Sequence, residues 1–245
     1  MPTAPEPFFT HVRLRRQDFV SGVYPINIPA VDQIESIRFH PNVTIFAGEN
    51  GSGKSTLIEA IAIAAGFNAE GGRKSFNTPQ TSTDSSLSDA ISLARTANRE
   101  QDGYFLRAES TYVLSNYLNE INESRHYGGD LHRKSHGESF MAIFEHRFRE
   151  SRRALFILDE VESALSPQRQ LEFLALMHLH IKRGSQFIIS THSPILMSYP
   201  SSRLYWLDEA GLAIRDWRET NHFKLYQAIL ANPEIAHREL DCDEQ

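Results

Sequence analysis

The stretch Gly48-Glu-Asn-Gly-Ser-Gly-Lys-Ser55 decides the fold of this chain. It matches G-x-x-x-x-G-K-[ST] at every fixed position, which is the pattern of a phosphate-binding loop. Such a loop connects a buried strand to a helix, and the sequence predicts both. The apolar run Val43–Ala47 precedes it, and the apolar segment Ser55–Ala65 follows it. A glycine-rich turn that contains Lys-Ser by chance would lack these flanks, so we predict a nucleotide-binding loop.

Each position of this loop has a chemical reason. Glycines let the backbone wrap a β-phosphate with its N–H groups pointing inward, and the helix that begins near Lys54 adds the partial positive charge of its N-terminus. Lys54 is expected to bridge the β- and γ-phosphates of ATP, and the Ser55 hydroxyl to ligate Mg²⁺. Thr56 can add a hydroxyl to the α-phosphate. The predicted nucleotide contacts are Gly48, Glu49, Asn50, Gly51, Ser52, Gly53, Lys54, Ser55 and Thr56.

Titratable side chains follow two further predicted strands. The apolar run Ala154–Leu158 ends in Asp159 and Glu160, and the run Gln186–Ser190 leads to His192. In open α/β sheets, ligands bind at the carboxyl ends of the strands. Asp159 is therefore expected to hold Mg²⁺, and Glu160 to act as the base for an attacking water. Exposed acids at a strand end are common, so this interpretation depends on the nearby phosphate loop.

The order of elements predicts an α/β fold: a mixed central sheet covered by helices. An antiparallel β segment is predicted before the loop, from three short extended runs: Phe8–Arg15, Tyr24–Ile28 and Ile34–Phe39. After the loop we expect a polar insertion over 67–86, a helix over Leu87–Ala97, a strand over Tyr104–Glu109 and a helix over Ser110–Ile121. We assign 1–245 to one domain, with a small helical lobe at about 67–150 and an acidic tail at 234–245.

Composition and charge exclude several classes of protein. The net charge is −6, and the tail 234–245 carries five acids and one base, so the rest carries only −2. This balance argues against a dominant basic face for nucleic acid. Only Leu131–Arg153 has a local excess of bases, for which a solvated helix face is the simpler explanation. A single cysteine excludes a disulfide framework.

No membrane or export signal is apparent. No apolar run approaches the roughly 20 residues of a membrane span, and the N-terminal residues lack the pattern of a signal peptide. Heptads of a coiled-coil arm are also absent from the sequence. We therefore expect a cytoplasmic protein.

Together these motifs resemble the ATP-binding-cassette (ABC) class of P-loop ATPases, over roughly Val43–Pro194. In that class a signature motif lies between the phosphate loop and the Asp-Glu pair. Lys134-Ser-His-Gly-Glu138 is similar to it at Ser135 and Gly137, with Glu138 in place of glutamine. Ser163-Ala-Leu-Ser166 resembles the D-loop without its last acid. Glu109 lies near the position of a glutamine that contacts Mg²⁺-bound water in the class, and it is a further candidate for the metal site.

A closer resemblance is to small stand-alone bacterial ATPases grouped as "AAA family" ABC-like proteins. It rests on strings such as S-H-G-E-S-F at 135–140 and L-D-E-V-E-S-A-L-S-P-Q-R-Q at 158–170. The class implies a head-to-tail homodimer that holds two ATP molecules between its subunits. Ser135 and Gly137 would then cap the γ-phosphate of ATP bound by the partner's Lys54. Glu160 would activate water, and His192 would stabilise the γ-phosphate.

Three functions remain open at this point. The first is a soluble ATPase that works as a dimerisation switch, in nucleic-acid transactions or defence, with nucleic acid or another protein as partner. The second is the nucleotide-binding subunit of a membrane transporter; a neighbouring permease gene would favour it. Against it, only 81 residues (135 − 54) separate Lys54 from Ser135. The third is a regulatory ATP binder without turnover, against which Glu160 and His192 argue.

The sequence also leaves open which residue would contact the adenine ring. Tyr24, 24 residues before Gly48, has the flat ring that stacking needs, although a buried core tyrosine is the simpler explanation. Phe19 is a second candidate. In the polar insertion, Arg73 and Lys74 are candidates for a phosphate contact, and the segment Arg147–Arg153 is a candidate for direct DNA binding.

Overall fold

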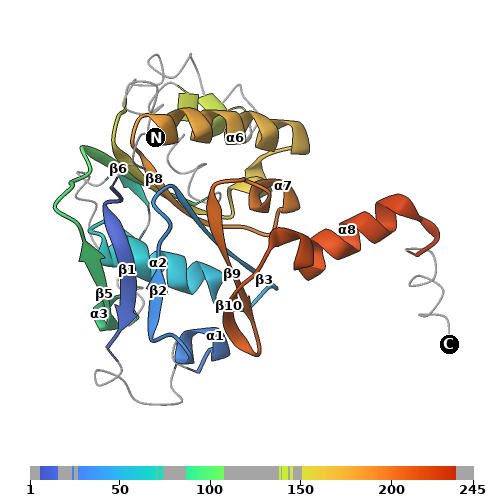
Figure 1. The fold of residues 1–245 in the computed structure, drawn as a ribbon, viewed down its shortest axis with the longest axis horizontal. Helices are drawn as coiled ribbons and strands as arrows, with labels where there is room; N and C mark the ends of the chain where they lie inside the picture. Colours follow the sequence, from blue (N-terminus) through green and yellow to red (C-terminus); the bar gives the residue numbers. More distant parts are fainter. Residues whose placement is uncertain are drawn as a thin grey trace.

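A seven-stranded mixed sheet forms the centre of the computed structural model (Figure 1). The strand order is β10-β9-β3-β8-β7-β6-β4. The five inner strands are parallel to one another, and the edge strands β10 and β4 are antiparallel to their neighbours. The expected mixed sheet is thus confirmed. Its strands are β3 (Val43–Gly48), β4 (Gly72–Arg73), β6 (Asp102–Arg107), β7 (Ala154–Asp159), β8 (Gln186–Ser190), β9 (Ser202–Asp208) and β10 (Gly211–Ile214). The structure describes residues 6–15, 24, 27–69, 71–73, 87–107, 138, 140–142, 144–145 and 151–235.

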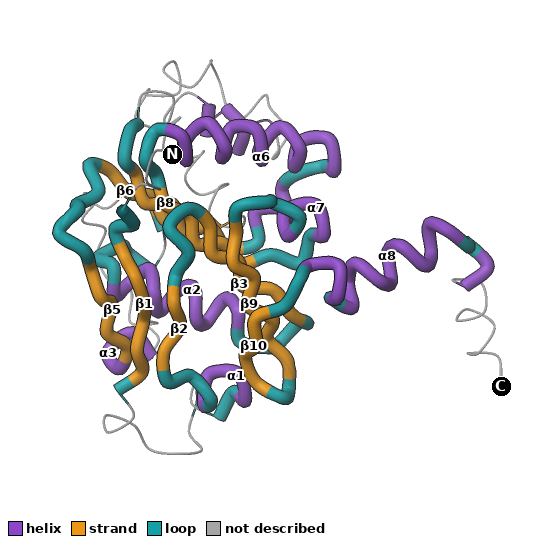
Figure 2. The backbone as a smooth tube through the Cα atoms, viewed as in Figure 1, coloured by secondary structure: helices purple, strands orange, loops and turns teal. Residues whose placement is uncertain are grey.

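Each face of this sheet has its own hydrophobic core, because successive side chains of a strand point to opposite faces. In β3, Ile45 belongs to one core and the next residue, Phe46, to the other. The first core includes side chains of α6 (Pro167–Lys182) and α7 (Pro194–Met197), and the second includes those of α2 (Lys54–Ala64). Helices therefore cover both faces, as expected (Figure 2).

The predicted N-terminal antiparallel β segment is also confirmed. It is a three-stranded sheet in the order β2-β1-β5, made of β1 (Phe9–Leu14), β2 (Ser36–Arg38) and β5 (Ile91–Arg95). The buried amide of Gln186 in β8 fixes it to the central sheet. Its Oε1 accepts from the backbone N–H of Phe9 at 3.1 Å, and its Nε2 donates to the carbonyl of Phe9 at 2.9 Å.

The predicted helix over Leu87–Ala97 is wrong after its first turn. α3 covers only Leu87–Ala90, and β5 follows directly and pairs antiparallel with β1. Ile91 is buried and Leu93 packs against the same core, so the apolar residues follow the alternation of a strand. The partner strand β1 is distant in the sequence, and such tertiary pairing overrides local preference.

The extended segment predicted over Tyr24–Ile28 is wrong as well. Tyr24 lies in a turn, and a short helix, α1 (Pro29–Asp32), begins immediately after Ile28. Proline is favoured in the first turn of a helix, because its missing N–H would have no intrahelical partner there. The polar insertion also contains a strand, since Gly72 and Arg73 form β4 at the edge of the central sheet.

The division into a single domain with a helical lobe at about 67–150 and an acidic tail at 234–245 stays a prediction. Within the lobe range, residues 91–95 and 102–107 belong to the two sheets, and the described residues from 138 to 145 are helical. The helix predicted over Ser110–Ile121 lies outside the described residues.

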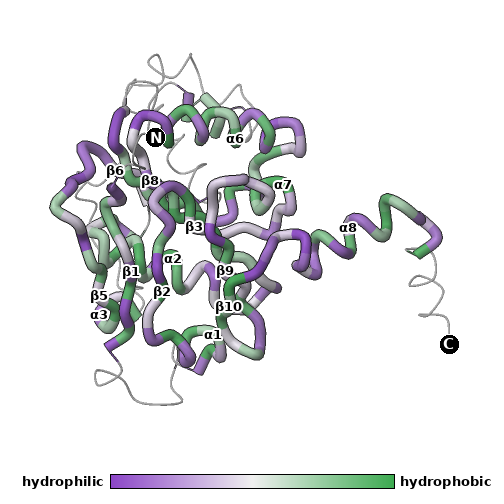
Figure 3. Tube along the Cα trace, viewed as in Figure 1, coloured by the Kyte–Doolittle hydropathy of each residue, from purple (hydrophilic) through white to green (hydrophobic). Residues whose placement is uncertain are grey.

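Helix α8 (Asn221–Ala231) extends away from the rest of the molecule (Figure 1). None of its residues is buried, and hydrophobic and hydrophilic residues alternate along its length (Figure 3). It follows a short 3₁₀ turn, η5 (Trp217–Glu219), and begins beside the phosphate loop, as described below. Within the described part of the chain, no helix is both long and apolar enough to cross a membrane.

Candidate active site

The phosphate loop connects the end of β3 to the start of α2, as predicted. Its backbone requires glycine at two positions where other residues lie too close to leave room for a Cβ atom. A Cβ at Gly48 would lie 2.1 Å from the carbonyl oxygen of Leu207, and a Cβ at Gly53 would lie 2.7 Å from the side chain of Ile28. Gly53 also has a φ of +94°, which other residues rarely adopt. These glycines therefore let the loop curl tightly over the first turn of α2.

Lys54 and Ser52 make this loop suitable for an anion. The Lys54 side chain is buried, and its Nζ donates to the carbonyl oxygen of Glu49 at 2.8 Å. Burial lowers its pKa, while the nearby carboxylates of Glu160 and Asp159 act in the opposite direction. The Ser52 hydroxyl is buried without a hydrogen-bond partner. A buried, unsatisfied donor beside a buried ammonium fits a phosphate group.

Asp159 lies at the end of β7 and is almost fully buried. Its Oδ1 accepts from the hydroxyl of Ser190, the last residue of the neighbouring strand β8, at 2.5 Å. Strand β8 lies between β7 and β3, so the phosphate loop, Asp159 and His192 follow three adjacent parallel strands at the same edge of the sheet. This is the arrangement that the strand-end argument predicted.

Glu160 and His192 form a polar pair at this edge. The Nε2 atom of His192 lies 3.1 Å from Oε1 of Glu160, and this hydrogen bond, more than any other contact, lowers the pKa of Glu160. Glu160 has a φ of +49°, in the left-handed region. Such strained backbone conformations are costly for residues other than glycine and occur often at functional sites. Here Glu160 immediately precedes the 3₁₀ turn η4 (Val161–Ala164), and its side chain lies beside the histidine.

The family of the chain follows from its sequence pattern: a family model described as an AAA domain matches residues 26–173, more than half of the 245 residues. The chain belongs to the AAA domain family. At the level of the family it is an ATPase-type P-loop NTPase. No curated protein matches the chain.

Two solved structures are similar to this chain at low sequence identity. The SMC head domain from Thermotoga maritima superposes with a TM-score of 0.50 at 17% identity, over 85% of this chain and 98% of that chain. CbiO1 from Clostridium perfringens, part of the ABC transporter complex cbiONQ, has a TM-score of 0.49 at 16% identity, over 95% of this chain and 99% of that chain.

Arg107 is one residue of this AAA domain that the sequence did not single out. Its Nε lies 3.4 Å from Oδ2 of Asp159, and one terminal nitrogen lies 2.9 Å from Oε2 of Glu59 in α2. Strands β6 and β7 pair in a register that places Arg107 directly beside Asp159. The guanidinium therefore neutralises one oxygen of the predicted metal ligand.

Glu162 is a second residue that was missed. Its Oε1 accepts from the backbone N–H of His192 at 2.5 Å, and its Oε2 is buried without a hydrogen-bond partner. Burial, the largest effect, raises the pKa of Glu162. The carboxyl group thus connects η4 to the segment that carries His192. The spacing Asp-Glu-Val-Glu at 159–162 was visible in the sequence, but a second acid in this spacing has no evident role without the fold.

His222, near the start of α8, is the third residue at the site that the sequence did not single out. Its Nε2 lies 3.5 Å from Oε2 of Glu49 in the phosphate loop. Its ring packs edge-on against Trp206, with 5.2 Å between ring centroids, and lies 5.4 Å from the ring of His192. Burial lowers the pKa of His222. The base of the extended helix α8 therefore contacts the phosphate loop directly.

The structure places Tyr24 beside the phosphate loop. Its hydroxyl lies 3.4 Å from the hydroxyl of Thr56, and its side chain is 61% exposed. The alternative of a buried core tyrosine is therefore wrong, and adenine stacking by Tyr24 stays a prediction. Arg73 lies in β4. The other candidates lie outside the described residues: Phe19, Lys74, Glu109, Ser135 and Gly137.

Proposed function

We propose that this protein binds ATP together with Mg²⁺, hydrolyses it to ADP and phosphate, and does so as a homodimer that encloses ATP between its subunits. The observation that carries the proposal is the Glu160–His192 pair, 3.1 Å apart, at the same sheet edge as the phosphate loop. An ionised carboxylate fixed by a histidine beside a phosphate cradle is suited to orient and deprotonate a water.

The residues of one subunit divide the chemistry between them. Lys54 would hold the β- and γ-phosphates, and the loop N–H groups would hold the β-phosphate. Glu160 would accept a proton from the attacking water as its oxygen bonds to the γ-phosphorus and the bond to the ADP oxygen breaks. His192 would keep Glu160 in place and stabilise the charge on the γ-phosphate. Ser55 and Asp159 would hold Mg²⁺, which neutralises phosphate charge when it is bound.

Exposure supports the dimer. The side chains of His192 and Glu160 are 25% and 39% exposed, so one subunit leaves this side of the site open to water. Phosphoryl transfer benefits from a site that excludes bulk water. In the proposed dimer, the partner's Ser135 and the partner's Gly137 would cover the γ-phosphate. The biological role that we propose is in nucleic-acid transactions or defence; a transporter subunit remains the alternative, which a neighbouring permease gene would favour.

The concentration dependence of ATP hydrolysis tests this proposal. If the active form is a dimer in equilibrium with monomers, phosphate release per mole of protein should rise severalfold between about 0.1 and 10 µM protein with Mg-ATP in excess. EDTA should abolish the activity. Phosphate release that is independent of protein concentration would contradict the dimer, and no release above a protein-free control would contradict hydrolysis.

Substitution of Glu162 provides a second test, because its carboxyl group holds the segment that carries His192 in position. Removing its carboxyl group in Glu162→Ala should lower kcat about five- to tenfold, the effect of about 1 kcal/mol from one lost hydrogen bond to the His192 segment. KM for ATP should change less than kcat, because the hydrogen bond that Glu162 accepts comes from the His192 segment and not from the phosphate loop. Glu162→Gln keeps an acceptor for the His192 N–H and should retain most of the activity. Equal losses in both variants, or a change in KM alone, would contradict the positioning role.

A further inference from the structure

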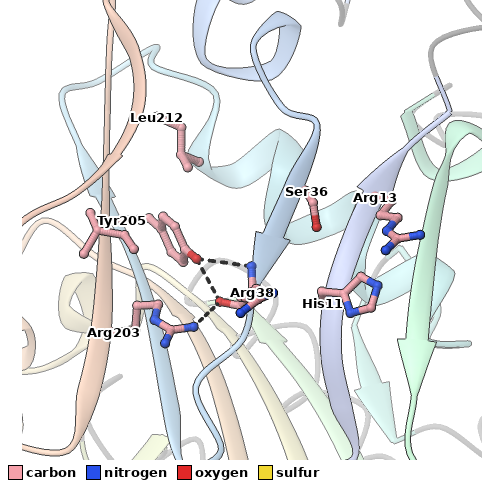
Figure 4. A pocket seen from close by; sticks show the side chains of 8 residues that line it. His11, Arg13, Ser36, Arg38, Arg203, Tyr205 and Leu212 are labelled. Atoms are coloured by element: carbon pink, nitrogen blue, oxygen red, sulfur yellow. Dashed lines mark hydrogen bonds between the residues drawn. The ribbon is translucent and has the colours of Figure 1, made fainter.

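A groove separate from the phosphate loop lies between the antiparallel sheet and the hairpin of β9 and β10 (Figure 4). Its volume is about 730 Å³, and it is open to solvent. Each of four strands contributes two residues: His11 and Arg13 from β1, Ser36 and Arg38 from β2, Arg203 and Tyr205 from β9, and Leu212 and Ile214 from β10.

The lining follows from strand geometry. Each of these pairs is two residues apart, so both side chains of a pair point to the same face of their strand. Pairing in register sets His11 beside Arg38 and Arg13 beside Ser36. Across the groove, a guanidinium nitrogen of Arg203 donates to the carbonyl oxygen of Arg38 at 3.1 Å, and the Tyr205 hydroxyl donates to the same oxygen at 2.9 Å. The floor of the groove is therefore fixed before any ligand binds.

Within the part of the chain that the structure describes, no acid forms an ion pair with Arg13, Arg38 or Arg203. Five other arginines there do have carboxylate partners, namely Arg95, Arg107, Arg169, Arg215 and Arg218, whereas Arg153 bonds to amide and carbonyl oxygens. A protein with a net charge of −6 thus concentrates three unpaired guanidinium groups in one concave place. Such a concentration favours a ligand that carries several negative charges.

The wall formed by β10 is apolar. Leu212 packs against the core, whereas Ile214 is 65% exposed. A cationic wall facing an apolar wall suits a chain molecule that has phosphates on one side and flat bases on the other. In a duplex the bases are stacked inside and cannot reach such a wall, but in a single strand they are accessible.

We propose that this groove binds single-stranded nucleic acid, with backbone phosphates on Arg13, Arg38 and Arg203 and bases against Leu212 and Ile214. Binding in this groove would specify how the protein contacts nucleic acid in the proposed function, and only the biological meaning of that binding rests on the proposed function. No residue of the phosphate loop, 48–55, lines the groove, although Leu212 pairs with Leu207, which in turn pairs with Gly48. The basic side is farther from the loop, because Arg203 pairs with Thr44, four residues and about 13 Å before Gly48 along β3.

Binding of a fluorescently labelled single-stranded oligonucleotide to the full chain tests this groove. The measurement is anisotropy without ATP, at about 50 mM salt and then at higher salt. Arg13→Glu and Arg38→Glu should each weaken binding at least tenfold and make its salt dependence shallower, by about 0.7 in slope for each lost phosphate contact. Lys182→Glu makes the same charge change at an exposed site in the last turn of α6, outside the groove, and should leave the affinity within about twofold of wild type.

Any one of the following results would overturn the proposal: no binding by the wild-type chain at the lowest salt, unchanged binding by both groove variants, an equal loss in Lys182→Glu, or tighter binding of a duplex than of a single strand. Displacement of the oligonucleotide by a mononucleotide at equal phosphate concentration would also overturn it and assign the groove to a free nucleotide. Melting temperatures of the variants, measured in parallel, show whether they fold. Because no ATP is present, a failure of the proposed hydrolysis would not affect the outcome.

Discussion

Lys54→Ala should abolish tight binding of ATP, raising the Kd for Mg-ATP by at least about 100-fold. The ammonium lies inside the phosphate loop, where its Nζ now donates to the carbonyl oxygen of Glu49 at 2.8 Å. Charge-assisted hydrogen bonds to two phosphates together contribute about 3 kcal/mol, and each 1.4 kcal/mol corresponds to about tenfold in affinity. Removing the ammonium also removes a positive charge that offsets the carboxylates of Asp159 and Glu160. Isothermal titration calorimetry with Mg-ATP measures the change.

Lys182→Ala is the matched control for this experiment. Lys182 is an exposed lysine in the last turn of α6, so its removal changes the net charge equally without affecting the loop. We expect its Kd for Mg-ATP to equal that of the wild type. If Lys54→Ala retained a Kd within about threefold of the wild type, the assignment of the loop as the phosphate site would be wrong.

Local sequence patterns predicted the parts of the fold that depend on local chemistry. The phosphate loop, the strand before it and the helix after it all follow from glycine conformation and from apolar periodicity. Helix α6 (Pro167–Lys182) is likewise marked locally, by a serine cap, a proline in the first turn and an amphipathic period. Strand β5 was missed, since the residues 91–95 become a strand only through pairing with β1.

The candidate site also contains both residues that local sequence predicts and residues that only contacts between distant segments bring in. Lys54, Asp159 and His192 could be found from sequence because each immediately follows or begins an element whose end is predictable. Arg107 and His222 could not be found in this way. Arg107 reaches Asp159 only through the register of β6 on β7, and His222 reaches Glu49 only because α8 begins beside the loop. Such contacts between distant segments leave no periodic signal in one sequence.

Glu160→Gln should separate ATP binding from ATP turnover. The amide keeps the shape of the side chain but cannot accept a proton, and a lost general base lowers kcat by about 10² to 10⁴. Mg-ATP should still bind, because Glu160 is not part of the phosphate loop, and removing its negative charge reduces repulsion of the γ-phosphate. With ATP bound and not hydrolysed, the enclosed form should accumulate. We expect gel filtration with Mg-ATP to show a dimer, and with EDTA a monomer.

Glu172→Gln is the control that separates the base from a general loss of charge. Glu172 lies in α6, is as exposed as Glu160 at 39%, and pairs with Arg169 rather than with a residue of the candidate site. It should hydrolyse ATP like the wild type and should not accumulate as a dimer. A Glu160→Gln protein that stays monomeric with ATP bound would contradict the enclosed dimer but leave the phosphate site intact. A Glu160→Gln protein that turns over ATP at the wild-type rate would instead show that another group accepts the proton.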